Sequence, residues 1–440
     1  MPRAGFADDW KAGAARVKIT PAHPMWMSGY SSRDHAAEGT SIDLWAKALV
    51  LEDPQGRRVA LVTLDLVGID RDFSRAVCAA IGEKHKLDRS QIALFSSHTH
   101  SGPVVGRTLM TMFFLEERER RLVADYTAQL ESQLVTLVGQ ALEQLAPARI
   151  AWGSGHSTIA VNRRNNKEPD VPALRQAGLL KGPVDYDVPV LSVRRPDGAL
   201  TAIVFGYACH STVLAFYDWS GDYPGFAQIE LEAAHPGAVA LFFAGCGGDQ
   251  NPLPRRTVDL ARAYGHSLAD SVEAVLAGVM QPISGSLDAR YAEVPVALDT
   301  LPTRDELEKQ SQSGEKYLAQ RAKVLLKQID AGQPLSQTYP YPVQLWSLGR
   351  ELQWVSLGGE VVVDYSLRLK RELGPGRTWV AAYANDVMAY IPSLRVLEEG
   401  GYEGGGAMIY YGLPTVWGPH VEETIVQGVH DLAGPRRIGD

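Results

Sequence analysis

An apolar segment that ends abruptly in two histidines constrains the fold of this chain more than any other feature. Residues 91–95 have the composition of a buried β-strand, and Ser-Ser-His-Thr-His-Ser-Gly-Pro follows at once. Alternate residues of a strand point to the same side, so His98 and His100 are predicted to converge on one point. Because imidazole is a common zinc ligand, we interpret the pair as half of a metal site; two surface-loop histidines are the alternative.

A second apolar segment ends in the same way. Residues 200–209 are predicted to form a strand, and His210 stands at its polar end. We interpret His210 as a further metal ligand or, alternatively, as a hydrogen-bonded histidine of the core. Residues 238–244 form a third such segment and run into a glycine-rich turn. That turn lacks the Lys-Ser/Thr of a phosphate-binding loop, which argues against a nucleotide site.

Asp65 interrupts an apolar strand that is predicted over residues 58–67. A buried carboxylate needs a partner, because desolvating an isolated charge is costly. We therefore expect Asp65 either to support a metal-bound histidine from behind or to cap the helix predicted near residues 71–82.

Strands that alternate with helices indicate the fold class. Helical patterns and further strands are predicted for residues 116–145, 303–331, 353–357, 361–373 and 378–384. The alternation predicts an α/β fold: a single large domain, residues 1–440, built around a mixed, largely parallel β-sheet flanked by helices.

Charge, cysteine content and the first residues exclude several classes of protein. The net charge of -8, with no basic stripe, argues against nucleic acid as a partner. Three scattered cysteines do not predict a disulfide framework or a cysteine metal site. Residues 1–10 lack the apolar core of a signal peptide, and no segment has transmembrane length. We expect a soluble, cytoplasmic protein, or a secreted or periplasmic one if a signal peptide has been removed; oligomeric state is not predicted.

Five motifs, in order along the chain, resemble the neutral (alkaline, non-lysosomal) ceramidase family, a group of zinc-dependent amidases. The most specific is His-Thr-His-Ser-Gly-Pro at residues 98–103. The others are Asn162-Arg163, the strand that ends at His210, Gly359-Glu360 before a helix, and Tyr390 with Tyr402 twelve residues later. The resemblance spans about residues 15–420 and implies the catalytic domain of that family, without its C-terminal β-sandwich domain.

The resemblance also implies a set of site residues. It makes four residues the ligands of one Zn²⁺ ion per chain: His98, His210, Glu360 and Tyr390. It places three residues at the substrate or transition state: His100, Arg163 and Tyr402. Asp65, Asp249 and Asn251 are assigned to substrate binding. Two imidazoles, a carboxylate and a phenol suit zinc and leave room for water.

Simpler structural roles remain open for three of these residues. Glu360 follows two glycines and can be the N-cap carboxylate of the next helix. Tyr390 can be a buried tyrosine with a satisfied hydroxyl group. Tyr402 lies among glycines, so it can belong to a loop that closes over substrate or simply pack beneath that loop.

Two departures from the family pattern affect the predicted substrate. Asn251 stands where the family has serine, and Val104 replaces the glycine after Gly-Pro. The leading hypothesis is a zinc hydrolase that uses zinc-activated water to cleave the amide bond of ceramide or another lipid-like or small N-acyl compound. A zinc hydrolase of esters, lactones or other small substrates is the alternative, and a lipid- or glycan-binding pseudoenzyme is a third possibility.

Overall fold

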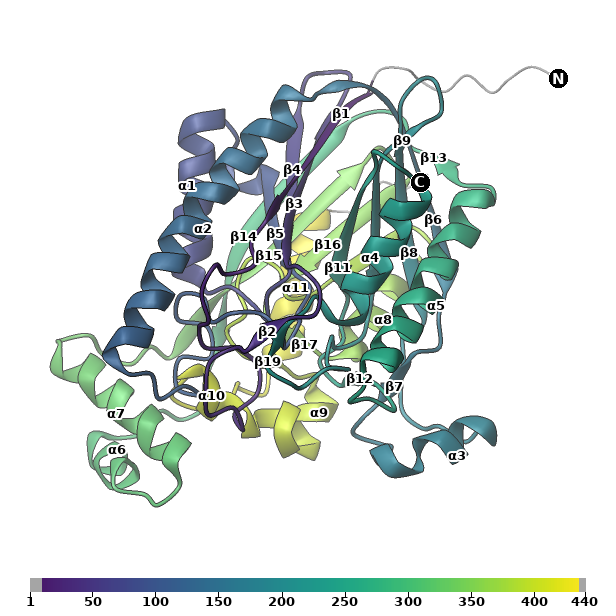
Figure 1. Ribbon diagram of the computed structural model, residues 1–440. Helices are drawn as coiled ribbons and strands as arrows, with labels where there is room; N and C mark the ends of the chain where they lie inside the picture. The colour runs from purple at the N-terminus through teal and green to yellow at the C-terminus, as the bar shows by residue number, and fades with distance from the viewer. Residues whose placement is uncertain (1–9, 435–440) are drawn as a thin grey trace.

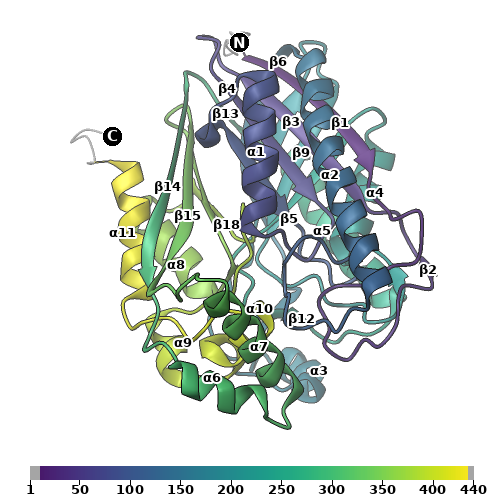
Figure 2. The ribbon, with the colours of Figure 1, turned by 90° about the vertical axis from the view of Figure 1, so that its left-hand side faces the viewer.

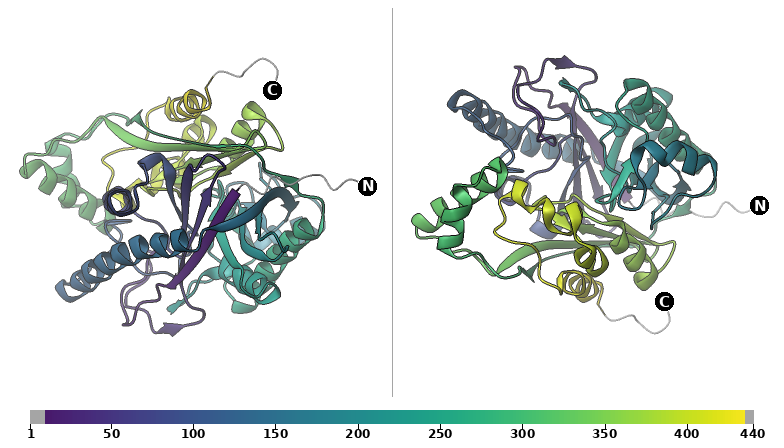
Figure 3. Two further views of the ribbon diagram at one scale, coloured as in Figure 1. Left: turned by 90° about the horizontal axis from the view of Figure 1, so that it is seen from above. Right: turned by 90° about the horizontal axis from the view of Figure 1, so that it is seen from below.

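The computed structural model describes residues 10–434 (Figure 1). Within this range the chain forms two facing β-sheets with helices on both outer sides, a layering that is visible along the molecule in Figure 3. Residues 1–9, most of the segment in which no signal peptide was predicted, lie outside the described residues. Between Trp10 and Gly434, no helix combines the length and apolarity that crossing a membrane requires.

The larger sheet has nine strands in the described chain, in the order β11-β9-β8-β6-β1-β3-β4-β5, with β13 paired to β6. Its strands are β1 (Trp10–Lys18), β3 (Trp45–Glu52), β4 (Arg58–Leu64), β5 (Ile92–Ser96), β6 (Ala146–His156), β8 (Asp187–Arg194), β9 (Leu200–Tyr207), β11 (Val239–Ala244) and β13 (Gln281–Pro282). The sheet is mixed, as predicted, but mostly antiparallel. The parallel pairs in residues 10–434 of this sheet are β4–β5 and β9–β11, so the expectation of a largely parallel sheet was wrong.

The connections explain the strand directions. Both parallel pairs of this sheet are joined by a crossover helix, which is what a parallel connection needs: α1 (Arg71–His85) links β4 to β5, and α4 (Asp222–Ala234) links β9 to β11. Tight turns join β3 to β4 and β8 to β9. In the first of these, the Asp53 carboxylate accepts hydrogen bonds from the backbone of Gln55 and Arg57 at 2.9 and 2.8 Å, which fixes an antiparallel hairpin.

Four helices cover the outer face of the large sheet: α1, α4, α2 (Glu117–Glu143) and α5 (Val258–Ala277). Figure 2 shows α1 and α2 lying across β1, β3 and β4. Alternation along β4 separates the two faces: Ala60 and Val62 belong to the cluster beneath the helices, whereas Val59 and Leu61 belong to the cluster facing the second sheet.

The second sheet was only half predicted. In the described chain it contains four strands, β14 (Leu287–Ala297), β15 (Thr338–Leu348), β16 (Leu352–Leu357) and β18 (Thr378–Ala381), in the order β14-β15-β16-β18. The segments 353–357 and 378–384 correspond to β16 and β18, but β14 and β15 were missed. Helices α8 (Val363–Leu373) and α11 (Val421–Ala433) cover its outer face.

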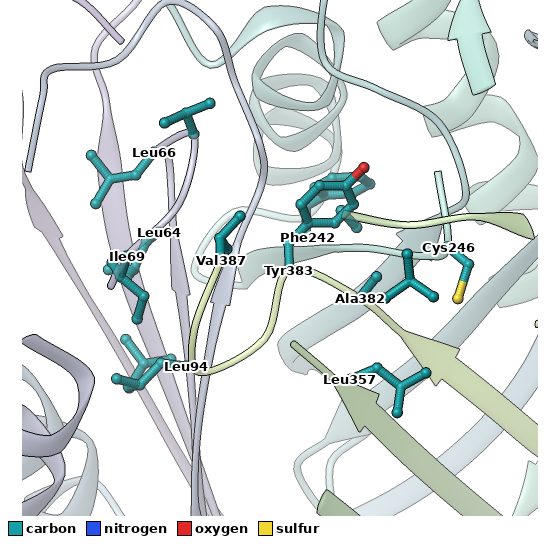
Figure 4. Packing of buried hydrophobic residues seen from close by; sticks show 14 of the residues in the cluster. Leu64, Leu66, Ile69, Leu94, Phe242, Cys246, Leu357, Ala382, Tyr383 and Val387 are labelled. Atoms are coloured by element: carbon teal, nitrogen blue, oxygen red, sulfur yellow. The ribbon is translucent and has the colours of Figure 1, made fainter. Parts of the chain in front are cut away.

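Aromatic side chains fill the space between the sheets. The ring centroids of Phe95 and Phe243, from the large sheet, lie 5.6 and 4.8 Å from that of Trp354 in β16. A separate apolar cluster lies toward the site and also contains residues of both halves, with Val387 beside Ile69 and Tyr383 near Phe242 (Figure 4). Two apolar clusters therefore join the halves.

Shorter elements complete the described chain. The helical pattern at 303–331 is two helices, α6 (Arg304–Ser311) and α7 (Lys316–Asp330). The rest are β2 (Gly39–Thr40), β7 (Ala160–Asn162), β10 (Asp218–Trp219), β12 (Gln250–Pro252), β17 (Glu360–Val361), β19 (Tyr390–Ile391), α3 (Val171–Gln176), α9 (Leu394–Glu399), α10 (Met408–Tyr411), the 3₁₀ turns Arg89–Gln91 and Glu168–Asp170, and a π-helical turn, Tyr402–Gly406.

Candidate metal centre and active site

The candidate site lies at one end of both sheets, where the chain leaves strands that have a parallel neighbour. His98 follows β5 and His210 follows β9, whereas Glu360 follows β16 and Tyr390 follows β18. Ligands of α/β proteins commonly bind beyond the carboxyl ends of parallel strands. Each sheet therefore contributes two of the four residues that were predicted as ligands.

His98 and His100 converge, although not by strand alternation. The strand ends at Ser96, and His98 has a left-handed backbone with φ of 58°. The two Nε2 atoms lie 3.0 Å apart in nearly perpendicular rings. The Nδ1–H group of His98 donates to the carbonyl oxygen of Val67 at 2.6 Å. Because a carbonyl only accepts, this contact assigns the proton to Nδ1 and leaves the Nε2 lone pair facing the site.

His210 is oriented in the same manner by the glycine-rich turn that follows β11. Its Nδ1–H group donates to the carbonyl oxygen of Gly247 at 2.7 Å, so its Nε2 atom also presents a lone pair. A Cβ atom on Gly247 would lie 2.8 Å from the backbone nitrogen of Cys209, which explains the glycine. The turn that resembles a phosphate loop thus supports a histidine.

Glu360 meets the histidines from the opposite sheet. β17 pairs with β19 in parallel, which places Glu360 beside Tyr390. The Oε2 atom of Glu360 lies 3.1 Å from Nε2 of His98 and 3.0 Å from Nε2 of His210. Helix α8 begins at Val363 with Val362 at its N-cap, so the alternative that Glu360 caps this helix was wrong.

The geometry of these acceptors fits a bound cation. Two imidazole lone pairs and a carboxylate oxygen face one another within hydrogen-bond distance, and no proton of the assigned tautomers lies between them. Oε2 of Glu360 has no hydrogen-bond partner among the described residues. His98, His100 and His210 are buried with ring nitrogens within 4.8 Å of one another. Nitrogen and oxygen donors of this kind suit zinc.

The pKa values favour the unprotonated state that metal ligands need. Burial, with help from the Arg163 cation, lowers the pKa of His210 to about 4. Burial and the neighbouring His98 and His210 rings hold the pKa of His100 well below its ordinary value. Burial acts to raise the pKa of Glu360, but the two histidines outweigh it and hold that pKa well below its usual range. At neutral pH, His100 and His210 are therefore neutral imidazoles and Glu360 is a carboxylate.

Arg163 connects the centre to its surroundings. Its guanidinium donates to Glu403 at 2.7 Å, to the side-chain oxygen of Asn251 at 3.2 Å and to the hydroxyl oxygen of Tyr390 at 3.1 Å. The Tyr390 hydroxyl in turn lies 3.1 Å from Nε2 of His210. Burial acts to lower the pKa of Arg163, but Tyr390 and Glu403 outweigh it, so that the pKa is raised well above its ordinary value. Arg163 is a fixed cation whose partners set its position.

Asn251 and Asp249 have different positions. Asn251 lies on β12, which pairs with β7, and its side chain touches Arg163. Asp249 is fully buried behind the site, where it accepts hydrogen bonds from the Asn162 amide at 2.9 Å and from the Val363 backbone at 3.0 Å. Asp249 thus holds β7 and the start of α8 together behind the site. Asn251, in contrast, lies at the site itself, in contact with Arg163.

Tyr402 stands at the edge of the site. Its side chain is 45% exposed, enough to meet a substrate, and its ring centroid lies 5.2 Å from that of Tyr390. The glycines around it form a π-helical turn, with Gly401 and Gly405 at φ of 78° and 158°. The ring of Tyr402 thereby lies beside Arg163, whose guanidinium carbon is 5.8 Å from the ring centroid.

Asp65 does not cap a helix. The cap of α1 is Asp70, whose carboxylate accepts from the backbone of Phe73 at 3.0 Å. Asp65 is buried and accepts from the backbone of Trp45 at 2.9 Å. Burial raises the pKa of Asp65, while the Lys47 cation and the hydrogen bond from the Trp45 backbone oppose the rise. His98 takes its own support from a carbonyl group instead.

A polar cavity of about 820 Å³ opens beside the centre. Arg163, Asn251 and Tyr402 form its wall nearest to the predicted ligands. A separate cavity of about 800 Å³ lies against α7 and includes Tyr411 in its lining.

The family model for the N-terminal part of neutral/alkaline non-lysosomal ceramidases matches residues 10–253, more than half of the chain. The chain belongs to this ceramidase family. The matched segment contains His98, His100, Arg163 and His210, whereas Glu360 and Tyr390 lie beyond it.

Curated members of the family match part of the chain. Neutral ceramidase of Pseudomonas aeruginosa is 28% identical over 266 residues, which cover 56% of this chain and 38% of that protein. Neutral ceramidase 2 of Arabidopsis thaliana is 33% identical over 229 residues, 50% of this chain and 29% of that protein. The sequence matches of this ceramidase-family chain therefore cover less than half of the length of these relatives.

Solved structures share the fold over nearly the whole chain. The crystal structure of P. aeruginosa neutral ceramidase aligns with a TM-score of 0.71 at 22% identity, covering 95% of this chain and 73% of that one. A structure described as ceramidase complexed with C2 aligns with a TM-score of 0.73 at 20% identity, covering 95% and 74%. The predicted α/β class and family resemblance are thus confirmed.

Sequence reasoning missed several residues around the centre of this ceramidase homologue. Tyr411 donates a short hydrogen bond from its hydroxyl to Oε1 of Glu360. Arg33, buried in a long loop, donates to the carbonyl oxygen of His100 at 2.7 Å, and the ring of Tyr30 lies 4.7 Å from the His100 ring. No motif marks these positions, because each contact joins segments that are distant in the sequence.

Proposed function

We propose that this chain is a zinc-dependent hydrolase of the neutral ceramidase type, which cleaves the amide bond of an N-acyl substrate. One observation carries the proposal: the lone pairs of His98 and His210 converge with a carboxylate oxygen of Glu360 in a buried cluster that lacks a proton between them. We assign one zinc ion per chain to these three residues and Tyr390. Bound there, zinc supplies Lewis acidity, which polarises a carbonyl group and makes water nucleophilic at neutral pH.

The remaining site residues would act on substrate and protons. His100 is neutral at pH 7, and its Nε2 atom lies 3.0 Å from that of His98, so it can help to position the substrate beside the predicted ligands. Arg163 provides a positioned cation beside the reacting groups. A phenol keeps its proton at neutral pH, so the hydroxyl of Tyr402, a residue that is 45% exposed, can donate to the oxygen that becomes negative in the transition state. Asn251, through its contact with Arg163, would help to hold that cation in place.

The proposal is tested by metal analysis together with a hydrolysis screen. The purified chain should bind zinc stoichiometrically and hydrolyse N-acyl amides, ceramide among them, with activity that a chelator removes and zinc restores. Esters and lactones belong in the same screen, because preference for them would replace the amide assignment. A protein that binds no stoichiometric metal, and whose activities are indifferent to chelator, would contradict the proposal.

A further inference from the structure

The polar cavity beside the centre has an unusual lining for an enzyme of lipids. Four cations, three carboxylates and three asparagines line it, and Leu253 is its one aliphatic residue in the described chain. Each methylene group that a ligand buries against apolar surface contributes roughly 0.8 kcal/mol, and Leu253 and the ring of Tyr402 are the apolar side chains that this wall offers in the described chain. Apolar side chains such as Leu109, Met110 and Met388 line the other cavity, beside α7.

The carboxylates of the polar cavity are already neutralised. Glu403 pairs with Arg163 at 2.7 Å and with Arg164 at 2.6 Å. Glu399 also pairs with Arg164, at 3.0 Å, and Glu168 pairs with Nε of a neighbouring arginine, Arg255, at 3.0 Å. The acidic groups are therefore occupied by partners within the wall itself.

One cation is left over. Lys167 is exposed at the cavity and has no ion-pair partner among residues 10–434. With four cations against three carboxylates the lining has a charge of +1, although the whole chain has a net charge of -8. Lys167 and the outer nitrogens of Arg255 thus contribute positive charge to a cavity that Arg163, a neighbour of the centre, also lines.

We infer that this cavity receives a carboxylate group of the substrate, so that the enzyme prefers N-acyl amino acids or similarly anionic small amides to long-chain ceramides. The inference rests on the proposed amidase function for its catalytic half, but recognition of the anion depends on the cavity alone. Lys167 acts as a specificity-determining residue. The bound carboxylate lies on the Lys167 side of Arg163, and the scissile amide lies beyond Arg163, toward the predicted metal ligands.

Binding tests the recognition without turnover. N-butylsulfonylglycine, whose sulfonamide resists hydrolysis, is compared by titration calorimetry with its N-methylamide, which lacks the charge. We expect the carboxylate to bind the zinc-loaded enzyme more tightly. The ratio of the two binding affinities should fall roughly two- to fivefold in Lys167→Ala, the size expected for an exposed charge pair, and further in Lys167→Glu. Added salt should also reduce this ratio. Lys84→Ala, which removes an exposed lysine from α1, should leave it unchanged.

Hydrolysis provides the second arm. N-butanoylglycine and N-propylsuccinamic acid place the carboxylate on the amine or the acyl side of the amide, and each is compared with its N-methylamide and with ceramide in mixed micelles. At least one anionic compound should have the highest kcat/KM, with Lys167→Glu reversing the preference. Equal binding of charged and capped probes, or preferred hydrolysis of ceramide, would overturn the inference. Charge-selective binding without hydrolysis of any amide would instead uphold anion recognition and refute the proposed amidase function.

Discussion

Replacing Tyr411 by phenylalanine tests the metal centre through a residue that touches neither of its histidines. The Tyr411 hydroxyl donates to Oε1 of Glu360, and both side chains are buried, at 8% and 3% exposure. This contact holds the carboxylate in an orientation in which its other oxygen, Oε2, faces His98 and His210. Tyr411→Phe keeps the ring and frees the carboxylate to rotate, while leaving Oε1 buried without a donor.

The size of the effect follows from the charge on the acceptor. Hydrogen bonds to ionised groups contribute about 1.5–3 kcal/mol, and 1.4 kcal/mol is about a factor of ten in affinity. We therefore expect zinc to bind Tyr411→Phe roughly 10–100-fold more weakly, as is usual when support for a metal ligand is lost. A competition titration against a chromophoric chelator measures this directly.

The neighbouring tyrosine provides a matched control. Tyr410 contacts Tyr317 and Tyr402 through its ring, and no hydrogen bond of its hydroxyl is present among the described residues. Tyr410→Phe should keep wild-type zinc affinity and a wild-type circular dichroism spectrum. If Tyr411→Phe binds zinc as tightly as the wild type, then Glu360 is not a ligand held by this tyrosine, and the reasoning fails.

Four further outcomes are expected. His98→Ala should lose stoichiometric zinc and hydrolysis together, because a ligand and its oriented lone pair disappear; metal analysis that finds full occupancy would reject His98 as a ligand. Tyr402→Phe should keep zinc but lose roughly 10²–10³-fold in kcat, whereas unchanged turnover would assign the exposed ring to packing. Gly359→Ala should destabilise the fold by about 1–3 kcal/mol in urea unfolding, because the position has φ of 76° and a Cβ atom would lie 2.7 Å from a backbone oxygen. Burial raises the pKa of Asp386 to about 7, so the free energy of unfolding should fall by up to about 4 kcal/mol as the pH rises from about 4 to 7 and the carboxyl group ionises. Asp386→Asn should remove this fall, and an unchanged pH profile of unfolding in the variant would refute the role of Asp386.

The local half of the site was accessible from the sequence. The strand before His98 and the strand before His210 are short, apolar and followed at once by polar residues, and that pattern survives in β5 and β9. Helix α2 was placed within two residues at each end, because its apolar periodicity is long. Such features depend on neighbours in the chain.

Prolines obscured the two missed strands of the second sheet, β14 and β15. β14 is an edge strand, where Pro295 is tolerated because one side of the strand has no partner. Pro340 and Pro342 lie in the part of β15 that pairs with β14 alone, since β16 joins only from Val343 onward. Proline within an apolar segment argues against a central strand, so the sequence pattern misled. The mostly antiparallel order of the large sheet also depends on pairings that local pattern does not specify.

The roles of Glu360 and Tyr390 came from resemblance to a family, because only long-range pairing unites them. β17 and β19 are two residues each, too short for a recognisable pattern, and their register alone aligns the two side chains. Tyr411 depends on a still more distant contact with Glu360. The contacts of such residues form only when the two sheets have docked, so the sequence alone does not reveal their roles.

The predicted ligands come from both layers of the fold, so a bound metal ion would hold the two layers together. His98 and His210 follow strands of the large sheet and Glu360 and Tyr390 follow strands of the second sheet, so a metal held by all four would bind only where both layers have docked. A ligand that binds the native state alone stabilises it by about 2.7 kcal/mol at 100 times its dissociation constant. The melting temperature of the chain should therefore rise with zinc concentration. Removal of zinc by a chelator should weaken the contact between the two layers before either layer unfolds.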